Sequence, residues 1–283
     1  MEYEHIAAAV KDRVLTLMLS RPEKLNAYTA QMGAELANVF ERADGDDDIR
    51  VIVVTGAGRG FCSGADISAG AESFDTGDGK GAHLFGKNAD KTARHAGGFV
   101  EAIFKCRKPS IAAINGAAVG VGATLALPMD IRIAAETARF GFVFARRGLV
   151  PEAGSAWFLP RIVGLSKAMQ WCLSGRLLSA PEALEAGLVS EVMAPDALLT
   201  RAEEIAREIA DETSAISIAL TRQMLWRYSG APDPFELLKI DGPLSVELGG
   251  TADVREGVSA FIEKRKPKFP GRVSKDMPSR SPF

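Results

Sequence analysis

Two glycine-rich segments are the parts of the sequence best suited to chemistry, since each follows a strand-like run. The first spans Gly60 to Asp66 and the second spans Asn115 to Gly122. Glycine lets the backbone approach a ligand closely and leaves amide N–H groups free, and a helix starting after Gly120 would add partial positive charge. Two such amides that converge on one oxygen would form an oxyanion hole, which stabilises a carbonyl as it gains negative charge. Spacing alone favours a simpler interpretation, two tight turns in a buried sheet.

Glu152 is a candidate carboxylate for proton transfer. It lies between Gly148 and Ser155, in a loop expected to open a helix. Its sequence neighbours are apolar, and if they face the site their burial would make the carboxylate a stronger base: Val150, Phe142, Phe144 and Trp157. Local sequence alone favours a plainer role, in which a glutamate after proline in a first helical turn compensates the helix dipole.

Several other kinds of site do not fit the motifs. The dinucleotide motif G-x-G-x-x-G fails at its last glycine in both places where it could begin: Phe61 stands there when the motif starts at Gly56, and Leu125 when it starts at Gly120. Gly60 to Gly64 departs by one residue from the serine hydrolase motif G-x-S-x-G. The three cysteines and three histidines lack the spacing of metal ligands or of a disulfide framework. We therefore expect no metal and no redox cofactor.

Composition indicates an ordinary globular protein. The chain has 283 residues, enough for one or two domains, and 34 basic against 36 acidic residues give a net charge of −2. This balance gives no reason to expect nucleic acid or an anionic membrane as partner. Ile111 to Met129 carries no charged side chain, but Asn115-Gly116 and Pro128 favour a strand, a turn and a buried helix over a membrane span. The acidic N-terminus does not resemble a signal peptide, so we expect a cytoplasmic protein.

The pattern of elements predicts an α/β core followed by helices. Apolar runs predict strands at Val14–Leu19, Arg50–Thr55, Ser110–Ile114 and Asp130–Ala134. Helical spacing predicts helices capped by Thr29, starting near Phe99, over Ser166–Ser174, after a capping box at Ser179–Glu182, and over Leu198–Ala210, Ser214–Trp226 and Ala252–Lys266. The long glycine-rich segment from Ser68 to Gly98 is interpreted as a functional lid or a mobile insertion.

Four segments together resemble the crotonase (enoyl-CoA hydratase/isomerase) superfamily, in order and at family spacing over residues 5 to 268. They are Arg21-Pro22-Glu23-Lys24-Leu25-Asn26-Ala27, Gly60 to Ile67, Asn115 to Gly122, and Glu256 to Arg265. The resemblance implies a spiral of ββα units with a C-terminal helical trimerisation region. It divides the chain into a spiral core (1–195), a helical region for oligomerisation and CoA contacts (196–266) and an irregular tail (267–283). It implies a homotrimer or a dimer of trimers.

The resemblance also implies a ligand and its contacts. The substrate would be an acyl-CoA thioester of the kind found in fatty acid metabolism, with coenzyme A entering only as part of it. The amides of Ala65 and Val121 would form the oxyanion hole. The residues expected to contact CoA are Lys24, Ala27, Ala65, Asp66, Ile67, Phe261 and Lys264, the last near the phosphates of CoA and often from a neighbouring subunit. From its local sequence, the Asp66 side chain is expected to fix the turn.

The reaction depends on which carboxylates are present. Typical hydratases of this family use two glutamates, whose positions correspond here to Thr124 and Phe144. Glu152 instead resembles the single carboxylate of one group of enoyl-CoA isomerases. We therefore expect a shift of an enoyl double bond by Glu152. Alternatives are a hydratase with a nonstandard base, a catalytically silent relative that binds CoA esters, and hydrolysis of a thioester or C–C bond.

Overall fold

Two β-sheets form the centre of the molecule. The computed structural model describes residues 3–75, 81–85 and 98–282. In spatial order the larger sheet contains β1 (Ile6–Lys11), β2 (Val14–Leu19), β3 (Val51–Gly56), β5 (Ser110–Ile114), β7 (Ile131–Ala135) and β10 (Glu191–Met193). Strand β1 pairs antiparallel with β2, and every later pair in this sheet is parallel.

The smaller sheet is built from strands of three residues each. Its order is β4 (Gly60–Cys62), β6 (Ala117–Val119), β8 (Arg139–Gly141) and β9 (Leu177–Ser179). The first three run parallel, and β9 pairs antiparallel with β8. Strands β4, β6 and β8 each follow a strand of the larger sheet in the chain, so a strand pair followed by a helix recurs three times. The predicted spiral of ββα units is therefore confirmed.

The described part of the chain contains eleven helices. Those of the first 195 residues are α1 (Ala30–Gly45), α2 (Ala82–Phe85), α3 (Phe99–Lys105), α4 (Val121–Leu125), α5 (Ser155–Val163), α6 (Leu165–Ser174) and α7 (Ala180–Glu185). The C-terminal helices are α8 (Leu198–Glu212), α9 (Ala215–Tyr228), α10 (Phe235–Gly249) and α11 (Ala252–Glu263). Short 3-10 turns occupy Pro22–Lys24, Gly70–Glu72 and Phe144–Arg147.

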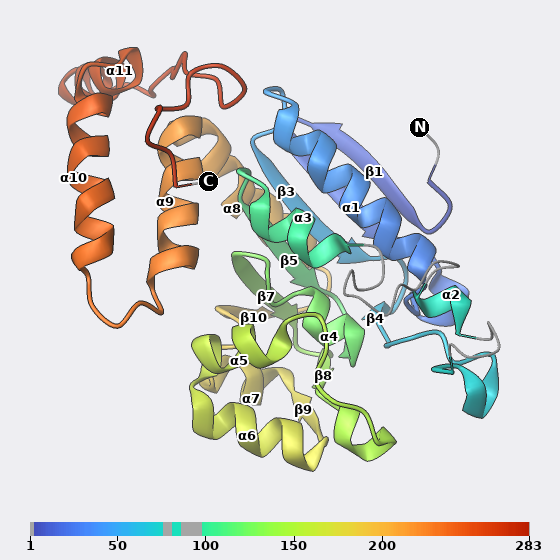
Figure 1. The fold of residues 1–283 in the computed structure, drawn as a ribbon. Coiled ribbons are helices and arrows are strands. Elements are labelled where there is room, and N and C mark those ends of the chain that lie inside the picture. The colour runs from blue at the N-terminus through green and yellow to red at the C-terminus, as the bar shows by residue number, and fades with distance from the viewer. Residues whose placement is uncertain (1–2, 76–80, 86–97, 283) are drawn as a thin grey trace.

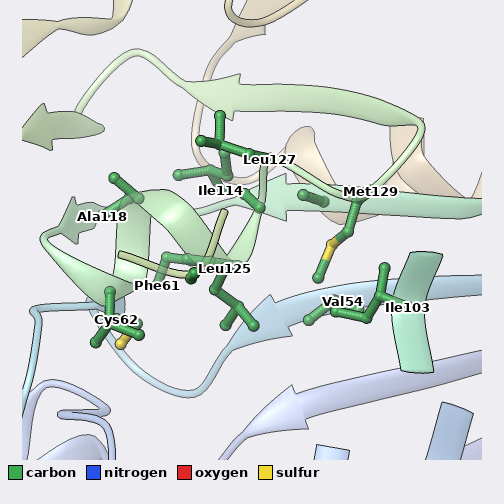
Figure 2. Packing of buried hydrophobic residues seen from close by; sticks show 14 of the residues in the cluster. Val54, Phe61, Cys62, Ile103, Ile114, Ala118, Leu125, Leu127 and Met129 are labelled. Atoms are coloured by element: carbon green, nitrogen blue, oxygen red, sulfur yellow. The ribbon is translucent and has the colours of Figure 1, made fainter. Parts of the chain in front are cut away.

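Alternate residues of the central strands pack in two different clusters. Val51 and Val53 of β3 pack with the fully buried alanines of α8. Ile52 and Val54 belong to the main core with residues of α1 and α3. Figure 1 shows α1 and α3 on the near face of the larger sheet, and Figure 2 shows side chains of both sheets, α3 and α4 in the main core. Burial on both faces explains why this strand reads as one apolar run.

Local capping signals in the sequence are confirmed. The Thr29 side chain accepts a hydrogen bond from the Met32 backbone N–H at the start of α1. Ser179 and Glu182 form a complete capping box at α7. The last predicted helix ends earlier than Lys266, because Lys264 adopts a left-handed conformation (φ 54°) that closes α11 at Glu263.

The uncharged stretch that could suggest a membrane span folds as predicted, with β5 and β6 followed by the short helix α4. In the described residues, no helix has the length and apolar character needed to cross a membrane. Of the segment from Ser68 to Gly98, residues 76–80 and 86–97 lie outside the described part, so its proposed role as a lid is not addressed by the fold.

The last three helices, α9 to α11, extend away from the sheets, and the tail returns. Figure 1 shows α9, α10 and α11 to one side of the core, with the last residues beside α9. Residues 267–282 contain no helix or strand, as predicted for the tail. They are nevertheless held, because Val273 is buried, its carbonyl accepts from the Arg107 guanidinium, and Ser274 donates to Asp47.

Candidate active site

A cavity of about 300 Å³ lies where the two glycine-rich turns meet. Ala65 of the first turn, Val121 of the second turn and Glu152 all line it. The fold therefore brings together three residues that are far apart in the sequence and that were predicted to act together.

The first turn follows β4 and is braced from the segment around Asn26. The Asn26 side-chain amide donates to the carbonyls of Ala57 and Gly60, at 2.9 and 2.8 Å, and this residue is fully buried. Tyr28 pairs with the turn on both sides of Ala65: its N–H donates to the Gly64 carbonyl, and its carbonyl accepts from the Asp66 N–H. This pairing fixes the backbone around Ala65. It uses the Gly64 carbonyl and the Asp66 N–H, and it leaves the Ala65 N–H unused.

The second turn is Gly120, which connects β6 to α4. Its backbone (φ 55°, ψ −124°) lies in a region that favours glycine. Val121 is the first residue of α4, so its N–H has no acceptor within the helix. One residue later α4 lies directly on β4, because a Cβ added at Gly122 would overlap the Cys62 carbonyl oxygen.

The two turns lie side by side, close enough that a side chain at Gly120 would contact the first turn. A Cβ added at Gly120 would lie 3.9 Å from the Gly64 Cα. Within the described residues, the N–H groups of Ala65 and Val121 form no hydrogen bond to another backbone group or side chain. Two amides beside one cavity and without an internal acceptor are compatible with the predicted oxyanion hole, which stays a prediction.

Glu152 lies before α5 rather than inside its first turn. The helix starts at Ser155, after Ala153 and Gly154 have both adopted positive φ angles of 53° and 69°. The Glu152 carboxylate accepts a hydrogen bond from the Thr124 hydroxyl of α4, with 2.5 Å between Oγ1 and Oε1. Since the side chain borders the cavity and is held by a residue of another element, compensation of the helix dipole does not explain its position.

Of the four apolar residues predicted to surround Glu152, two line the cavity and two do not. Phe144 and Val150 line the cavity, as expected. Phe142 instead is fully buried and stacks on Trp171, with ring planes 6° apart. Trp157 also does not line the cavity: it packs edge-on against Phe104 and Phe158, and the Arg161 guanidinium covers its ring. The expected role of these two aromatic residues is therefore wrong.

Other ionisable groups near the cavity are poor proton carriers at neutral pH. Burial raises the pKa of the Cys62 thiol to about 12. Burial, and then the charge of Glu152, raises the pKa of the Tyr28 hydroxyl. Among the described residues that line the cavity, Glu152 is the only one with a carboxylate. No group of three or more potential metal ligands (His, Cys, Asp or Glu) occurs in the described residues.

Asp66 fixes the first turn through its side chain. Its carboxylate pairs with the Arg21 guanidinium at 2.8 Å and accepts from the Ser68 N–H, while Arg21 also donates to the Ala27 carbonyl. Partial burial would raise the pKa of Asp66, but the hydrogen bonds from Arg21 and Ser68 outweigh it and lower the pKa to about 2. A carboxylate held in this way serves structure rather than proton transfer.

Replacing Asp66 with asparagine is expected to lower the free energy of unfolding by about 1–2 kcal/mol at pH 7. Because the pKa of about 2 in the folded state lies below the usual 3.8, the stabilisation is complete above pH 4 and is lost as the pH falls towards 2. Denaturant unfolding of wild type and variant at several pH values measures this difference. A difference that remains constant down to pH 2 would contradict the assignment.

The residues predicted to contact CoA fall into two groups. Lys24, Ala27, Asp66 and Ile67 belong to the two segments that form the first turn, and Ile67 lines the cavity while 56% exposed. Phe261 lies on α11 and is 85% exposed, and Lys264 follows this helix. Figure 1 shows α11 at the far end of the C-terminal helices, well away from α4, and neither residue is among the described residues that line the cavity.

Three site residues were not predicted as such. Tyr28 and Arg147 line the cavity, and Thr124 is fully buried behind Glu152. Tyr28 directly follows the Asn26-Ala27 motif, which was an available signal. Thr124 was noted only as the position of a missing glutamate, and its contact with a residue 28 positions later has no local sequence signature.

Comparisons with known proteins agree in the family they indicate. A family model described as enoyl-CoA hydratase/isomerase matches residues 9–272. An enoyl-CoA hydratase of Alternaria alternata is 40% identical over 260 residues, covering 91% of this chain and 83% of the relative. A 1,2-epoxyphenylacetyl-CoA isomerase of Escherichia coli is 38% identical over 285 residues, covering 95% of this chain and 99% of the relative.

Solved structures show the same architecture. The crystal structure of an enoyl-CoA hydratase from Bacillus anthracis has a TM-score of 0.84 and 31% sequence identity, covering 95% of this chain and 100% of the other.

Proposed function

Because this chain belongs to the enoyl-CoA hydratase/isomerase family, we propose that it is an enzyme that binds an acyl-CoA thioester in this cavity and shifts the double bond of an enoyl group. One observation carries the proposal. Glu152 supplies the single carboxylate among the described cavity residues, while the two positions of the hydratase glutamates hold Thr124 and Phe144. One carboxylate suffices to carry a proton between two carbons, whereas activation of water by the usual pair of glutamates has no counterpart here.

The proposed reaction moves one proton and one double bond. The Glu152 carboxylate removes a proton from C4 of a trans-2-enoyl thioester, or from C2 of a 3-enoyl thioester, and the electrons of the broken C–H bond flow toward the thioester oxygen. The resulting dienolate is stabilised by hydrogen bonds from the Ala65 and Val121 N–H groups. Protonated Glu152 then returns the proton to the other carbon, so the carboxylate is regenerated and no co-reactant is consumed.

The CoA portion of the substrate would bind along the first turn. The exposed Ile67 and the backbone around Lys24 and Ala27 are proposed to contact it, with Asp66 holding that backbone in place. Phe261 and Lys264 are exposed and lie far from the cavity of their own chain, which favours contacts with CoA bound to a neighbouring copy. This is the arrangement expected of a homotrimer or a dimer of trimers, and we propose such an assembly. We also propose a role in fatty acid metabolism.

A product assay tests the proposed function. Purified protein is incubated with a 3-enoyl-CoA and, separately, with a trans-2-enoyl-CoA, and the products are separated by chromatography and identified by mass and NMR. We expect interconversion of the two positional isomers. Accumulation of 3-hydroxyacyl-CoA would favour a hydratase with a nonstandard base, and release of free CoA would favour a hydrolase. Tight binding of a CoA ester without turnover would favour a silent binding relative.

A second candidate is the isomerisation of an aromatic epoxide carried as a CoA ester. It is favoured by the 38% identity to a protein named 1,2-epoxyphenylacetyl-CoA isomerase, over 95% of this chain. Including that epoxide ester in the same panel distinguishes the two isomerase activities through the ratio of their kcat/KM values.

A further inference from the structure

We propose that Thr124 is a positioning residue that holds Glu152 in one place in both of its protonation states. This inference rests on the proposed function, because it matters only if Glu152 takes up and releases a proton. Thr124 lies on α4 and is fully buried. Its hydroxyl therefore cannot exchange its protein partners for bulk water during the reaction.

The Thr124 hydroxyl has one proton and, among the described residues, two possible acceptors. Its Oγ1 lies 2.5 Å from Glu152 Oε1 and 3.3 Å from the Val121 carbonyl oxygen. A hydrogen bond to an ionised acceptor is the stronger of the two, so the hydroxyl donates to Glu152 when that residue is a carboxylate. This bond holds the carboxylate at the cavity wall before proton transfer.

After proton transfer the same atoms can hydrogen-bond in the reverse direction. A hydroxyl oxygen accepts as well as donates. Protonated on Oε1, Glu152 donates to Thr124 Oγ1, and the Thr124 proton rotates to the Val121 carbonyl. Each state keeps the Thr124 hydroxyl and the Glu152 oxygen that faces it hydrogen-bonded, so neither state carries the cost of an unmade bond at this buried position.

The same arrangement connects the base to the oxyanion hole. Val121 would supply its N–H to the substrate oxygen, and its carbonyl lies within reach of the Thr124 hydroxyl. The first turn of α4 therefore holds both the proposed electrostatic donor and the support of the base. Threonine itself does not ionise at neutral pH, so Thr124 adds no second base. A threonine here thus suits single-carboxylate proton transfer.

The test replaces Thr124 by valine, which keeps the branched shape and removes the hydroxyl, and by serine, which keeps the hydroxyl. For the valine variant we expect kcat for double-bond migration to fall about 10- to 100-fold, the usual effect of losing a hydrogen bond to a charged group, with KM within about twofold. The serine variant should retain kcat within about threefold. Thr55→Val is the matched control, because Thr55 is also a buried threonine whose hydroxyl donates a hydrogen bond, in this case from β3 to the Ala113 carbonyl. The kcat of this variant should equal that of the wild type.

Combining Thr124→Val with Glu152→Gln separates this inference from the proposed function. If Thr124 acts through Glu152, the double variant should be no slower than Glu152→Gln alone. Wild-type kcat in Thr124→Val, or an equal loss in the serine and valine variants, would overturn the positioning role while Glu152→Gln remains inactive. Full activity of Glu152→Gln would instead exclude Glu152 as the base, and a wild-type protein that shifts no enoyl double bond would overturn the proposed function itself.

Discussion

Glu152→Gln is expected to lower kcat for double-bond migration about 10³-fold, which lies within the range for loss of a general base. The substitution keeps the size of the side chain and removes its ability to accept a proton from carbon. Local structure should persist, because the glutamine side chain can still pair with the Thr124 hydroxyl. KM for the enoyl-CoA should change little, since the CoA contacts proposed above lie on the first turn. Steady-state kinetics with a 3-enoyl-CoA measures both quantities.

Glu136→Gln provides the matched control for this experiment. Glu136 is an exposed glutamate next to β7 and does not line the cavity, so the same chemical change there should leave kcat unaltered. Migration of the double bond in Glu152→Gln at the wild-type rate would exclude this residue as the base.

Val121→Pro is expected to lower kcat about 10²- to 10³-fold, the effect of removing one donor from an oxyanion hole. Proline has no N–H, and the first position of a helix is where its ring fits best. The residue before a proline must avoid helical angles, and Gly120 meets this need with φ 55° and ψ −124°, the mirror image of an extended conformation. The variant can therefore fold while it lacks the proposed donor.

Val121→Ala is the companion variant, since it shortens the side chain but keeps the N–H. We expect its kcat to stay within a few-fold of wild type, and both variants to show similar thermal unfolding. Equal kcat values for the proline and alanine variants would mean that the Val121 N–H does not stabilise the transition state.

Long apolar runs and capping residues were readable from the sequence, whereas the smaller sheet was not. Val14–Leu19 and Ser110–Ile114 are strands with the predicted bounds: half-buried side chains interrupt the buried ones in the first, and the second is buried throughout. Strands β4, β6 and β8 have only three residues each, too few for a periodic pattern. They were nevertheless implied by the resemblance, through the glycine-rich segments around them.

Placement of aromatic side chains could not be predicted from proximity in sequence. Phe144 and Phe142 are two residues apart, yet the first lines the cavity and the second stacks on Trp171 of α6. Trp157 lies five residues after Glu152 but belongs to a cluster with Phe104 and Trp226. In each case the deciding partner comes from a distant helix, which local pattern does not identify.

The close contact between Gly122 and the Cys62 carbonyl has a consequence for how such an enzyme can diversify. Because the start of α4 and strand β4 are packed together without an intervening side chain, the two proposed amide donors cannot be re-aimed independently by ordinary point mutations. New substrate ranges would then have to arise from substitution of cavity-lining side chains such as Val150, Ile67 and Arg147. The position proposed to bind the reacting carbonyl would stay unchanged. The backbones of paralogues with different acyl preferences should accordingly superimpose at the two turns, while the side chains around the cavity differ.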